Sequence, residues 1–398
     1  MGIRVASLNV WALPAGLARH EGERMRAIAG TLPKLAPDLL AFQEVWTETS
    51  RDKLVAGARA AGLQSIWHPQ DMSDSGGLLI ASRFPLADVR FDAYRARGFP
   101  ERIQHSDYWG GKGFIRARVD TPYGVLDFAN THLHANYAPP GTPDEYVGVR
   151  TAQLVQFAAG LRDARAPLLA VGDFNLVESE DGYDVLRGLS GLQDVATALD
   201  RREATARAGN PYRRKARDDS RIDYVFERPG EERRLVAKSI ERVFDTPLQF
   251  GGEPGNYSDH AGLLATFEFE AHRATRPPPD RALIERARDL LAEGRALALR
   301  RRSNQRQTAA AAGCAVLIGA AATRMPRVTR RRLLRNALVL GCATSGGLGA
   351  GHLWLSEWIH PDEVSSFDAA LADLEDYLAP LRRHTRTSPI QSTEEPLS

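Results

Sequence analysis

Residues 168–175 read LLAVGDFN, an apolar run that ends in two polar side chains, Asp173 and Asn175. A continuous apolar run of this kind is typical of a β-strand that is covered on both faces. Since neighbouring side chains of a strand alternate in direction, Asp173 and Asn175 are expected on one face, where the strand ends. The stretch therefore predicts a sheet-based protein that carries polar groups at a strand end.

The same pattern recurs along the first 270 residues. Short apolar runs predict strands, and apolar residues at helical spacing predict helices between them. The expected strands cover residues 3–10, 38–46, 77–82, 113–119, 125–132, 168–174, 221–227 and 261–268, and the expected helices cover 21–35, 51–61 and 153–162. This alternation predicts an α/β fold. By itself it fits either two packed sheets flanked by helices or one doubly wound sheet.

Polar residues stand at the ends of most of these runs. They are Asn9, Glu44, His132, Asp173, Asn175, Asp223, Asp259 and His260. Polar groups that converge at strand ends from separate parts of a chain are how a sheet scaffold builds a hydrolytic site. Carboxylate and amide oxygens suit a hard divalent cation, and imidazoles beside carboxylates suit proton transfer. The residue types therefore indicate metal-assisted hydrolysis.

Five further motifs accompany GDFN, in a fixed order. They are FQEVW at 42–46, DYWGGKG at 107–113, NTHLHA at 130–135, RIDYV at 221–225 and SDHAGLLATF at 258–267. Together they resemble the endonuclease/exonuclease/phosphatase superfamily of metal-dependent phosphodiesterases, and in detail its neutral sphingomyelinases. The resemblance implies a four-layer αββα sandwich, two packed sheets flanked by helices, with residues 1–272 as the catalytic domain.

The resemblance also implies a metal site and a general base. Mg²⁺, with Mn²⁺ as the alternative, is expected at Glu44 and Asn9, with Asp259 assisting the metal or its waters. His260 matches the general base, because an imidazole with a pKa near about 6.5 takes a proton from water at neutral pH. Asp223 matches the carboxylate that orients this imidazole.

The remaining site residues are expected around the phosphate. His132 matches the residue that holds the phosphate or protonates the leaving oxygen. Asp173 is expected to position the water or the leaving group, and Asn175 to bind a phosphoryl oxygen. Asp107 and Lys112 resemble a pair that is linked to switching the site on, and His134 is expected at the rim of the site or behind it.

The expected reaction is therefore hydrolysis of a membrane phospholipid. Water would convert sphingomyelin, or a related phosphosphingolipid or lyso-phospholipid, to ceramide or another neutral lipid and a phosphorylated head group. A metal-dependent nuclease and a phosphoinositide phosphatase share the same metal core and remain alternatives. A non-catalytic membrane adaptor is disfavoured, because every expected catalytic position is filled.

Charge and cysteine content exclude several classes of protein. The 398 residues carry a formal net charge of only +2, so no overall basic field indicates a nucleic-acid partner. The only cysteines, Cys314 and Cys342, lie in the apolar C-terminal part, which excludes a disulfide-stapled catalytic domain. The first residues lack the apolar core of a secretory signal. We therefore expect a cytoplasmic catalytic domain on a membrane-associated protein.

The composition changes near Pro277, and the rest of the chain reads as a membrane appendage. Residues 273–306 are expected to form a linker and a basic helix, 359–383 an amphipathic helix, and 384–398 a disordered tail. Between them, residues 307–358 hold apolar stretches at 309–323 and 337–355, which we interpret as a membrane-inserted hairpin that favours anionic lipid. The arginines that flank both stretches oppose two simple spans, so shallow insertion or a packed soluble hairpin remains open.

Overall fold

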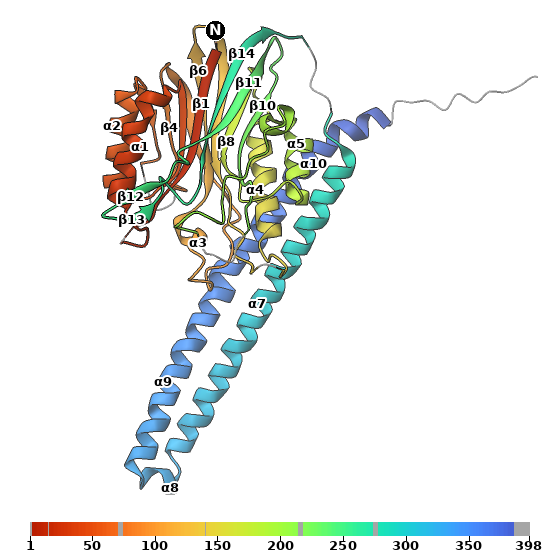
Figure 1. The fold of residues 1–398 in the computed structure, drawn as a ribbon. Coiled ribbons are helices and arrows are strands. Elements are labelled where there is room, and N and C mark those ends of the chain that lie inside the picture. Colours follow the sequence, from red (N-terminus) through yellow and green to blue (C-terminus); the bar gives the residue numbers. More distant parts are fainter. Residues whose placement is uncertain are drawn as a thin grey trace, which may run out of the picture.

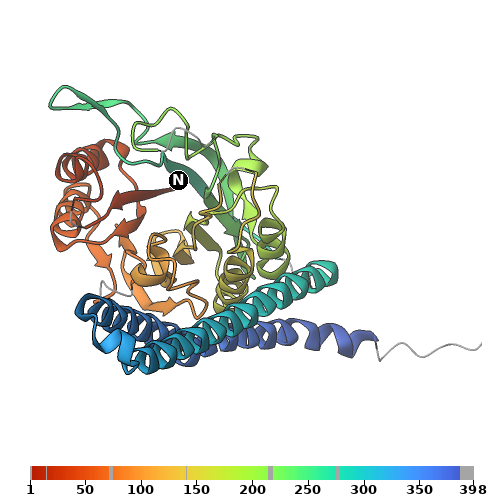
Figure 2. The same ribbon diagram turned by 90° about the horizontal axis from the view of Figure 1, so that it is seen from below.

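Two six-stranded sheets pack face to face in the computed structural model of the chain (Figure 1). It describes residues 2–14, 16–70, 75–139, 141–213, 218–273 and 278–385, and of residues 379–385 only the backbone. Helices cover the outer faces of both sheets, as Figure 2 shows from below. The four-layer αββα sandwich is therefore confirmed, and the doubly wound single sheet is excluded.

The first sheet is built around the N-terminal strand. Its order is β11 (Arg233–Val243), β14 (Gly262–Ala271), β1 (Gly2–Ala12), β2 (Leu39–Val45), β4 (Leu79–Ser82) and β3 (Ser65–Trp67). β1 runs parallel to β2 and antiparallel to β14. The edge strand β11 was not expected, because its exposed, highly charged sequence lacks the apolar run that marks the central strands.

The second sheet carries the stretch LLAVGDFN at its centre. Its order is β5 (Leu86–Ala93), β6 (Gly113–Thr121), β7 (Gly124–His132), β8 (Leu168–Asp173), β10 (Asp223–Arg228) and β9 (Gln193–Asp194). β7 and β8 are parallel, and β10 returns antiparallel beside β8. A separate hairpin of β12 (Leu248–Phe250) and β13 (Glu253–Gly255) stands apart from both sheets.

Alternation along β1 shows how the core is divided. Ile3 and Val5 lie in the apolar core between the sheets. Leu8 and Val10 face the other way, into the core beneath helices α1 (Glu21–Leu35) and α2 (Glu48–Ala60). Both sides of the strand are therefore buried, which explains its almost uninterrupted apolar sequence.

An additional layer of helices covers the second sheet. α4 (Val147–Gly160) and α5 (Asp181–Ser190) pack with α7 (Arg281–Thr323) and α10 (His360–Thr385) in one core. We expected residues 273–306 to be a linker and a basic helix, and the helix is longer than expected. α7 begins at Arg281, buries its apolar side on α4, and continues without a break to Thr323. Residues 274–277, within the expected linker, lie outside the described residues.

The second half of α7 leaves the catalytic part and forms a hairpin with α9 (Arg332–Trp354), joined by the short α8 (Pro326–Thr329) (Figure 1). Gly349 packs against Ala312 inside the hairpin. α9 continues through a π-helical turn, η1 (Leu355–Ile359), into α10. Beyond Thr385, the expected disordered tail of residues 384–398 lies outside the described residues.

One helix among the described residues is long and apolar enough to cross a membrane. It runs Arg332–Leu378, and only 6% of its apolar window is buried. Figure 1 shows where it lies: the strand β1 begins at the upper end of the sandwich, and the hairpin projects beyond the lower end, toward which β1 runs. The carboxyl ends of the parallel strands β1, β2, β7 and β8 therefore face the side on which the hairpin projects.

Candidate active site

Strand register brings three expected site residues side by side in the second sheet. His132, the last residue of β7, is the Cα partner of Asp173, the last residue of β8. Asp173 is in turn the partner of Asp223, the first residue of β10. All three side chains are buried. The end of one strand pair therefore collects an imidazole and two carboxylates in a single row.

The first sheet contributes two more residues, Asn9 and Glu44. Asn9 links Glu44 to this row of residues in the second sheet. Asn9 Nδ2 donates to Glu44 Oε1 at 3.0 Å and to Asp173 Oδ2 at 2.9 Å. The Asn9 side chain is fully buried. Glu44 has a positive φ of 59°, a conformation that costs energy in a non-glycine residue and that clusters at functional sites. Gly77 packs so closely on this backbone that a Cβ atom there would lie 2.8 Å from the Glu44 Cα atom.

His260 and Asp223 form a hydrogen-bonded pair. The two atoms Nδ1 of His260 and Oδ2 of Asp223 are 2.8 Å apart, and His260 Nε2 lies 3.9 Å from Asp173 Oδ2. Burial alone would lower the pKa of His260, but the charges of Asp223, Asp259 and Asp173 raise it well above its ordinary value. With Nδ1 fixed by Asp223, the free nitrogen Nε2 faces the centre of the site. This is the orientation that a general base requires, and the positive charge of a bound cation would offset the three carboxylates that raise the pKa of this imidazole.

Lys112 occupies the opposite side of the site. Its Nζ lies 3.1 Å from Asp107 Oδ1 and donates to His132 Nε2 at 2.7 Å. Burial would raise the pKa of Asp107, but Lys112 and the nearby histidines hold it well below its ordinary value. Burial and the charge of Lys112 both lower the pKa of His132, so this imidazole is neutral. The Lys112 side chain therefore joins Asp107 to His132 on this side.

The carboxylates of the site fit a divalent cation. Burial and the charge of Asp223 raise the pKa of Asp173 to about 7, and burial also raises the pKa of Glu44. Such shifts show that the buried carboxylates lack enough positive charge around them. Ligand atoms of Asp173, Asp223 and His260 lie within 4.8 Å of one another. An oxygen-rich set with excess negative charge is what a hard divalent cation binds.

Three further expected residues lie around this group. His134 follows the end of β7, is buried, stacks on Tyr146 with ring centroids 4.0 Å apart, and has Nδ1 3.6 Å from Asp107 Oδ2. Asn175 donates from Nδ2 to the Leu133 carbonyl oxygen at 2.9 Å. Asp259 contributes charge to Glu44 and His260.

Several positioning residues were not expected from the sequence. Arg24 is fully buried in α1, and its guanidinium donates to the carbonyl oxygens of Val10, Trp11 and Tyr257, which ties the end of β1 to the segment before His260. Gln43 Nε2 donates to Asn130 Oδ1 at 2.8 Å and joins the two sheets beneath the site. In the sequence, the only indication of these positioning roles is that each polar residue directly precedes or interrupts an apolar pattern.

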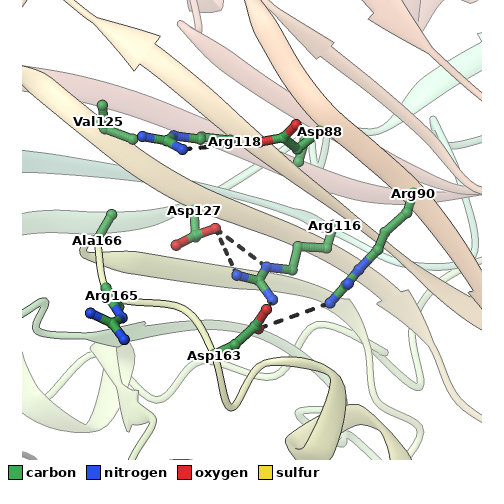
Figure 3. A pocket seen from close by; sticks show the side chains of 10 residues that line it. Asp88, Arg90, Arg116, Arg118, Val125, Asp127, Asp163, Arg165 and Ala166 are labelled. Carbon is green, nitrogen blue, oxygen red and sulfur yellow. Dashed lines mark hydrogen bonds and ion pairs between the residues drawn. The ribbon is translucent and has the colours of Figure 1, made fainter.

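A second depression lies at the other end of the sandwich. The pocket in Figure 3 has a volume of about 500 Å³ and includes Val125 and Asp127 near the start of β7. Arg116 is paired there with Asp127 at 3.1 Å and with Asp163. Most of its charges thus neutralise one another, and the pocket shares no residue with the group around His260.

The two-sheet fold and this cluster of buried carboxylates and imidazoles define a protein built for hydrolysis at a metal site. Residues 6–260 match the sequence profile of the Endonuclease/Exonuclease/phosphatase family, and the chain belongs to this family. The chain is 29% identical to sphingomyelin phosphodiesterase 2 of Homo sapiens over 297 residues, 70% of this chain and 67% of that protein. A Drosophila melanogaster relative is 28% identical over 270 residues, which cover 66% of this chain and 60% of that protein.

Solved structures share the fold at low sequence identity. Sphingomyelinase C of Streptomyces griseocarneus has a TM-score of 0.51 at 17% identity, covering 67% of this chain and 99% of that one. Beta toxin of Staphylococcus aureus, in a structure with bound magnesium ions, has a TM-score of 0.51 at 16% identity over the same shares. TDP2 of D. rerio, complexed with single-strand DNA product, has a TM-score of 0.53 at 20% identity over the same shares. These likenesses confirm the sandwich.

Proposed function

We propose that the chain is a metal-dependent phospholipase C that hydrolyses sphingomyelin or a related phosphosphingolipid. The observation that carries this proposal is that the site and the apolar hairpin face the same end of the sandwich (Figure 1). An enzyme whose substrate stays in a bilayer needs its site and its anchor on one side. The relative named sphingomyelin phosphodiesterase 2 supports the same substrate class.

The chain's own residues account for the proton transfers. Water attacks phosphorus and loses a proton to Nε2 of His260, which Asp223 keeps in the required tautomer through the 2.8 Å contact at Nδ1. The bond between phosphorus and the ceramide oxygen breaks, that oxygen takes up a proton supplied from solvent through His132, and His260 returns its proton to solvent. Lys112 holds positive charge beside His132 on the opposite side, where it can stabilise the phosphate. His132, on the same side, would hold the phosphate or protonate the leaving oxygen, and its contact with Nζ also positions the Lys112 side chain.

Glu44 would hold the divalent cation, with Asn9 as an amide ligand and Asp259 assisting. Bound there, Mg²⁺, or Mn²⁺ in its place, would polarise the phosphoryl oxygens. The acidic, oxygen-rich donor set supports this assignment, and the related fold crystallised with magnesium ions supports the choice of metal. Asp173, which lies between Asn9 and His260, would orient the attacking water.

The hairpin would anchor the protein in a membrane. α9 has 23 residues, and at about 1.5 Å per residue it is long enough for a hydrocarbon core of about 30 Å. Six arginines surround the turn between the helices, namely Arg324, Arg327, Arg330, Arg331, Arg332 and Arg335. These would favour anionic lipid, at about 1 kcal/mol for each one near the surface. The catalytic part would face the cytoplasm.

A nuclease is the second candidate, because TDP2 shares the fold. Tyr212, which precedes a basic stretch, is the aromatic residue that would suit a base-stacking platform, but its ring packs against other residues of the protein. Tyr212 packs on Trp11, with ring centroids 5.4 Å apart, and its hydroxyl lies 3.1 Å from His20 Nδ1. Of the basic residues that follow it, Arg213 is half-buried, and Arg214 and Lys215 lie outside the described residues. The nuclease reading also leaves the exposed apolar hairpin without a role.

Product analysis with a panel of substrates tests the proposal. Full-length protein with Mg²⁺ in mixed micelles is expected to release phosphocholine from sphingomyelin. Inositol phosphosphingolipid, phosphatidylcholine, lyso-phosphatidylcholine, a phosphoinositide and plasmid DNA serve as comparisons under the same conditions. Preferred cleavage of a phosphosphingolipid supports the proposal. Cleavage of DNA or of the phosphoinositide, with sphingolipids left intact, would overturn it.

A further inference from the structure

The catalytic part exposes few large apolar side chains. Among the described residues before α7, those with large exposed fractions are Leu17, Ile103 and Trp109, at 69%, 76% and 53%. Ile103 and Trp109 belong to one segment, the connection between β5 and β6 that contains the short helix α3 (Asp107–Gly110). The indole of Trp109 contacts the ring of Tyr108, with centroids 5.1 Å apart, yet about half of it stays exposed, six residues from an exposed isoleucine.

This segment lies beside the place where the hairpin leaves the sandwich. Glu101 is paired with Arg301 of α7 at 2.7 Å, and the Arg301 guanidinium stacks over Phe99 at 3.6 Å from the ring centroid. Burial raises the pKa of Tyr108 in α3, and the nearby negative charges of Glu363 and Asp362 in α10 add to this shift. Figure 1 shows α3 at the lower end of the sandwich, next to the emerging helices.

Two more exposed tryptophans mark the same level of the hairpin. Trp354 ends α9 and Trp358 lies in the π-helical turn, with exposed fractions of 48% and 71%. At this level Arg306 of α7 is paired with Glu357 at 2.6 Å, so charged groups lie beside the indoles. Tryptophans gather at the boundary between membrane and water, because their amphipathic rings favour the headgroup region.

We propose that Ile103 and Trp109, together with Trp354 and Trp358, form one surface that docks the catalytic part directly on a phospholipid bilayer. The occupant is the headgroup region of the membrane that holds the hairpin, so the inference rests on the membrane anchoring proposed above. The surface is continuous with α9, which ends at Trp354. The hairpin is then inserted in the membrane, and the catalytic part lies on the membrane surface where the hairpin emerges.

The same surface borders the site. Gly110 of α3 packs on the indole of Trp46, where a Cβ atom would lie 2.8 Å from Cη2, and Trp46 stands two residues after Glu44. α3 therefore lies between the proposed docking surface and the Glu44 side of the site. A lipid head group would pass beside α3 from the bilayer to the site, without the lipid chains leaving the membrane.

Depth-dependent quenching tests the docking in the full chain. In a Cys314→Ala/Cys342→Ala background, Ile103→Cys and Trp109→Cys are labelled with a fluorophore and mixed with phosphatidylcholine–phosphatidylserine vesicles. Lipids with a nitroxide near the headgroup are expected to quench both labels about twofold or more, as for an interfacial side chain. The matched control is Asp88→Cys, which is 79% exposed at its side chain and lies in the pocket of Figure 3; it should remain unquenched.

Each result has one meaning. Protein that floats with vesicles but whose labels at 103 and 109 stay unquenched overturns the docked surface while leaving the membrane anchor intact. Protein that does not float overturns the anchoring itself. A label change that depends on protein concentration and not on the nitroxide would show a contact between copies, which also overturns the inference.

A rate measurement without labels gives an independent check. On sphingomyelin vesicles, Trp109→Glu is expected to lose about tenfold in rate, because a charge at the interface opposes docking, whereas Trp109→Phe should keep most of it. Equal rates for Trp109→Glu and the unsubstituted protein would contradict the docked surface.

Discussion

Gly148 of α4 lies against Gly294 of α7, so closely that a Cβ atom built on Gly148 would come within 2.6 Å of the Gly294 Cα atom. Backbone therefore meets backbone where the first half of α7 crosses the catalytic part. Phe367 of α10 closes the same contact, since a Cβ atom on Gly294 would meet its ring at 2.6 Å. The helices on either side of the hairpin are thus components of the catalytic domain's core.

Gly148→Ala is expected to lower the free energy of unfolding by about 1–3 kcal/mol, because neither backbone can move without separating α7 from α4. Gly30→Ala is the matched control, since a Cβ atom there meets nothing within 4 Å in α1. That change should be neutral or stabilising by up to about 1 kcal/mol. Urea unfolding of both variants measures the difference. Equal stabilities would mean that α7 does not pack on α4 in solution.

The chain ending at residue 272, the expected domain boundary, is predicted to aggregate. Without α7 and α10, the apolar side of α4 around Val149 and Val155 would face water. Replacing residues 307–354 by a short Gly-Ser linker should instead give a soluble monomer, because Arg306 and Glu357 already lie side by side. Size-exclusion chromatography and circular dichroism distinguish the two. A stable, monomeric 1–272 fragment would restore the simpler domain boundary.

Loss of the base is expected to cost about 10²–10⁴-fold in turnover. His260→Ala removes the proton acceptor, and Asp223→Asn leaves it present but unfixed, so Asp223→Asn should retain more activity. Glu44→Gln should behave like removal of the metal by EDTA, and Mg²⁺ should restore only the unsubstituted protein. Steady-state rates are compared at matched folding, checked by thermal melting. Wild-type turnover by His260→Ala would refute the assignment of the base.

Glu227 is expected to make stability depend on pH. Burial raises the pKa of this carboxyl from 4.5 to about 7, despite the opposing charge of Arg234. The folded state therefore holds a proton that the unfolded state releases, and stability falls as pH rises from about 4.5 to about 7. Glu227→Gln should match the unsubstituted protein at pH 4 and exceed it by about 1–3 kcal/mol at pH 8. A difference that does not change with pH would show that the group is solvated.

The central strands and the order of the site residues followed from the sequence, because their signals are local. β8 is a continuous apolar run and β7 a largely apolar one, and the motifs place Asp173 and His132 at the ends of these strands and Asp223 at the start of β10. The edge strands β5 and β11 were missed. Their exposed faces interrupt the apolar pattern with charges, so they read as loops until a neighbouring strand supplies the hydrogen bonds.

Long-range packing explains the remaining differences. The polar residues 303–308 look like the end of a helix, yet α7 continues through them because its neighbour α9 and the turn at Glu357 pair with it. The contact between Gln43 and Asn130 joins residues 87 positions apart. Arg24 lies on the apolar side of α1. Its sequence neighbours do not indicate that its guanidinium donates to the carbonyl oxygens of Val10, Trp11 and Tyr257.

The position of a labelled oxygen tests the proposed reaction most directly. Sphingomyelin vesicles are incubated with the full-length protein and Mg²⁺ in water enriched in oxygen-18, and both products are analysed by mass spectrometry. Attack of water on phosphorus predicts phosphocholine that carries one heavy oxygen and unlabelled ceramide, with both products formed at least about 100-fold more slowly by His260→Ala. Label in ceramide, or release of choline and ceramide phosphate, would contradict the account.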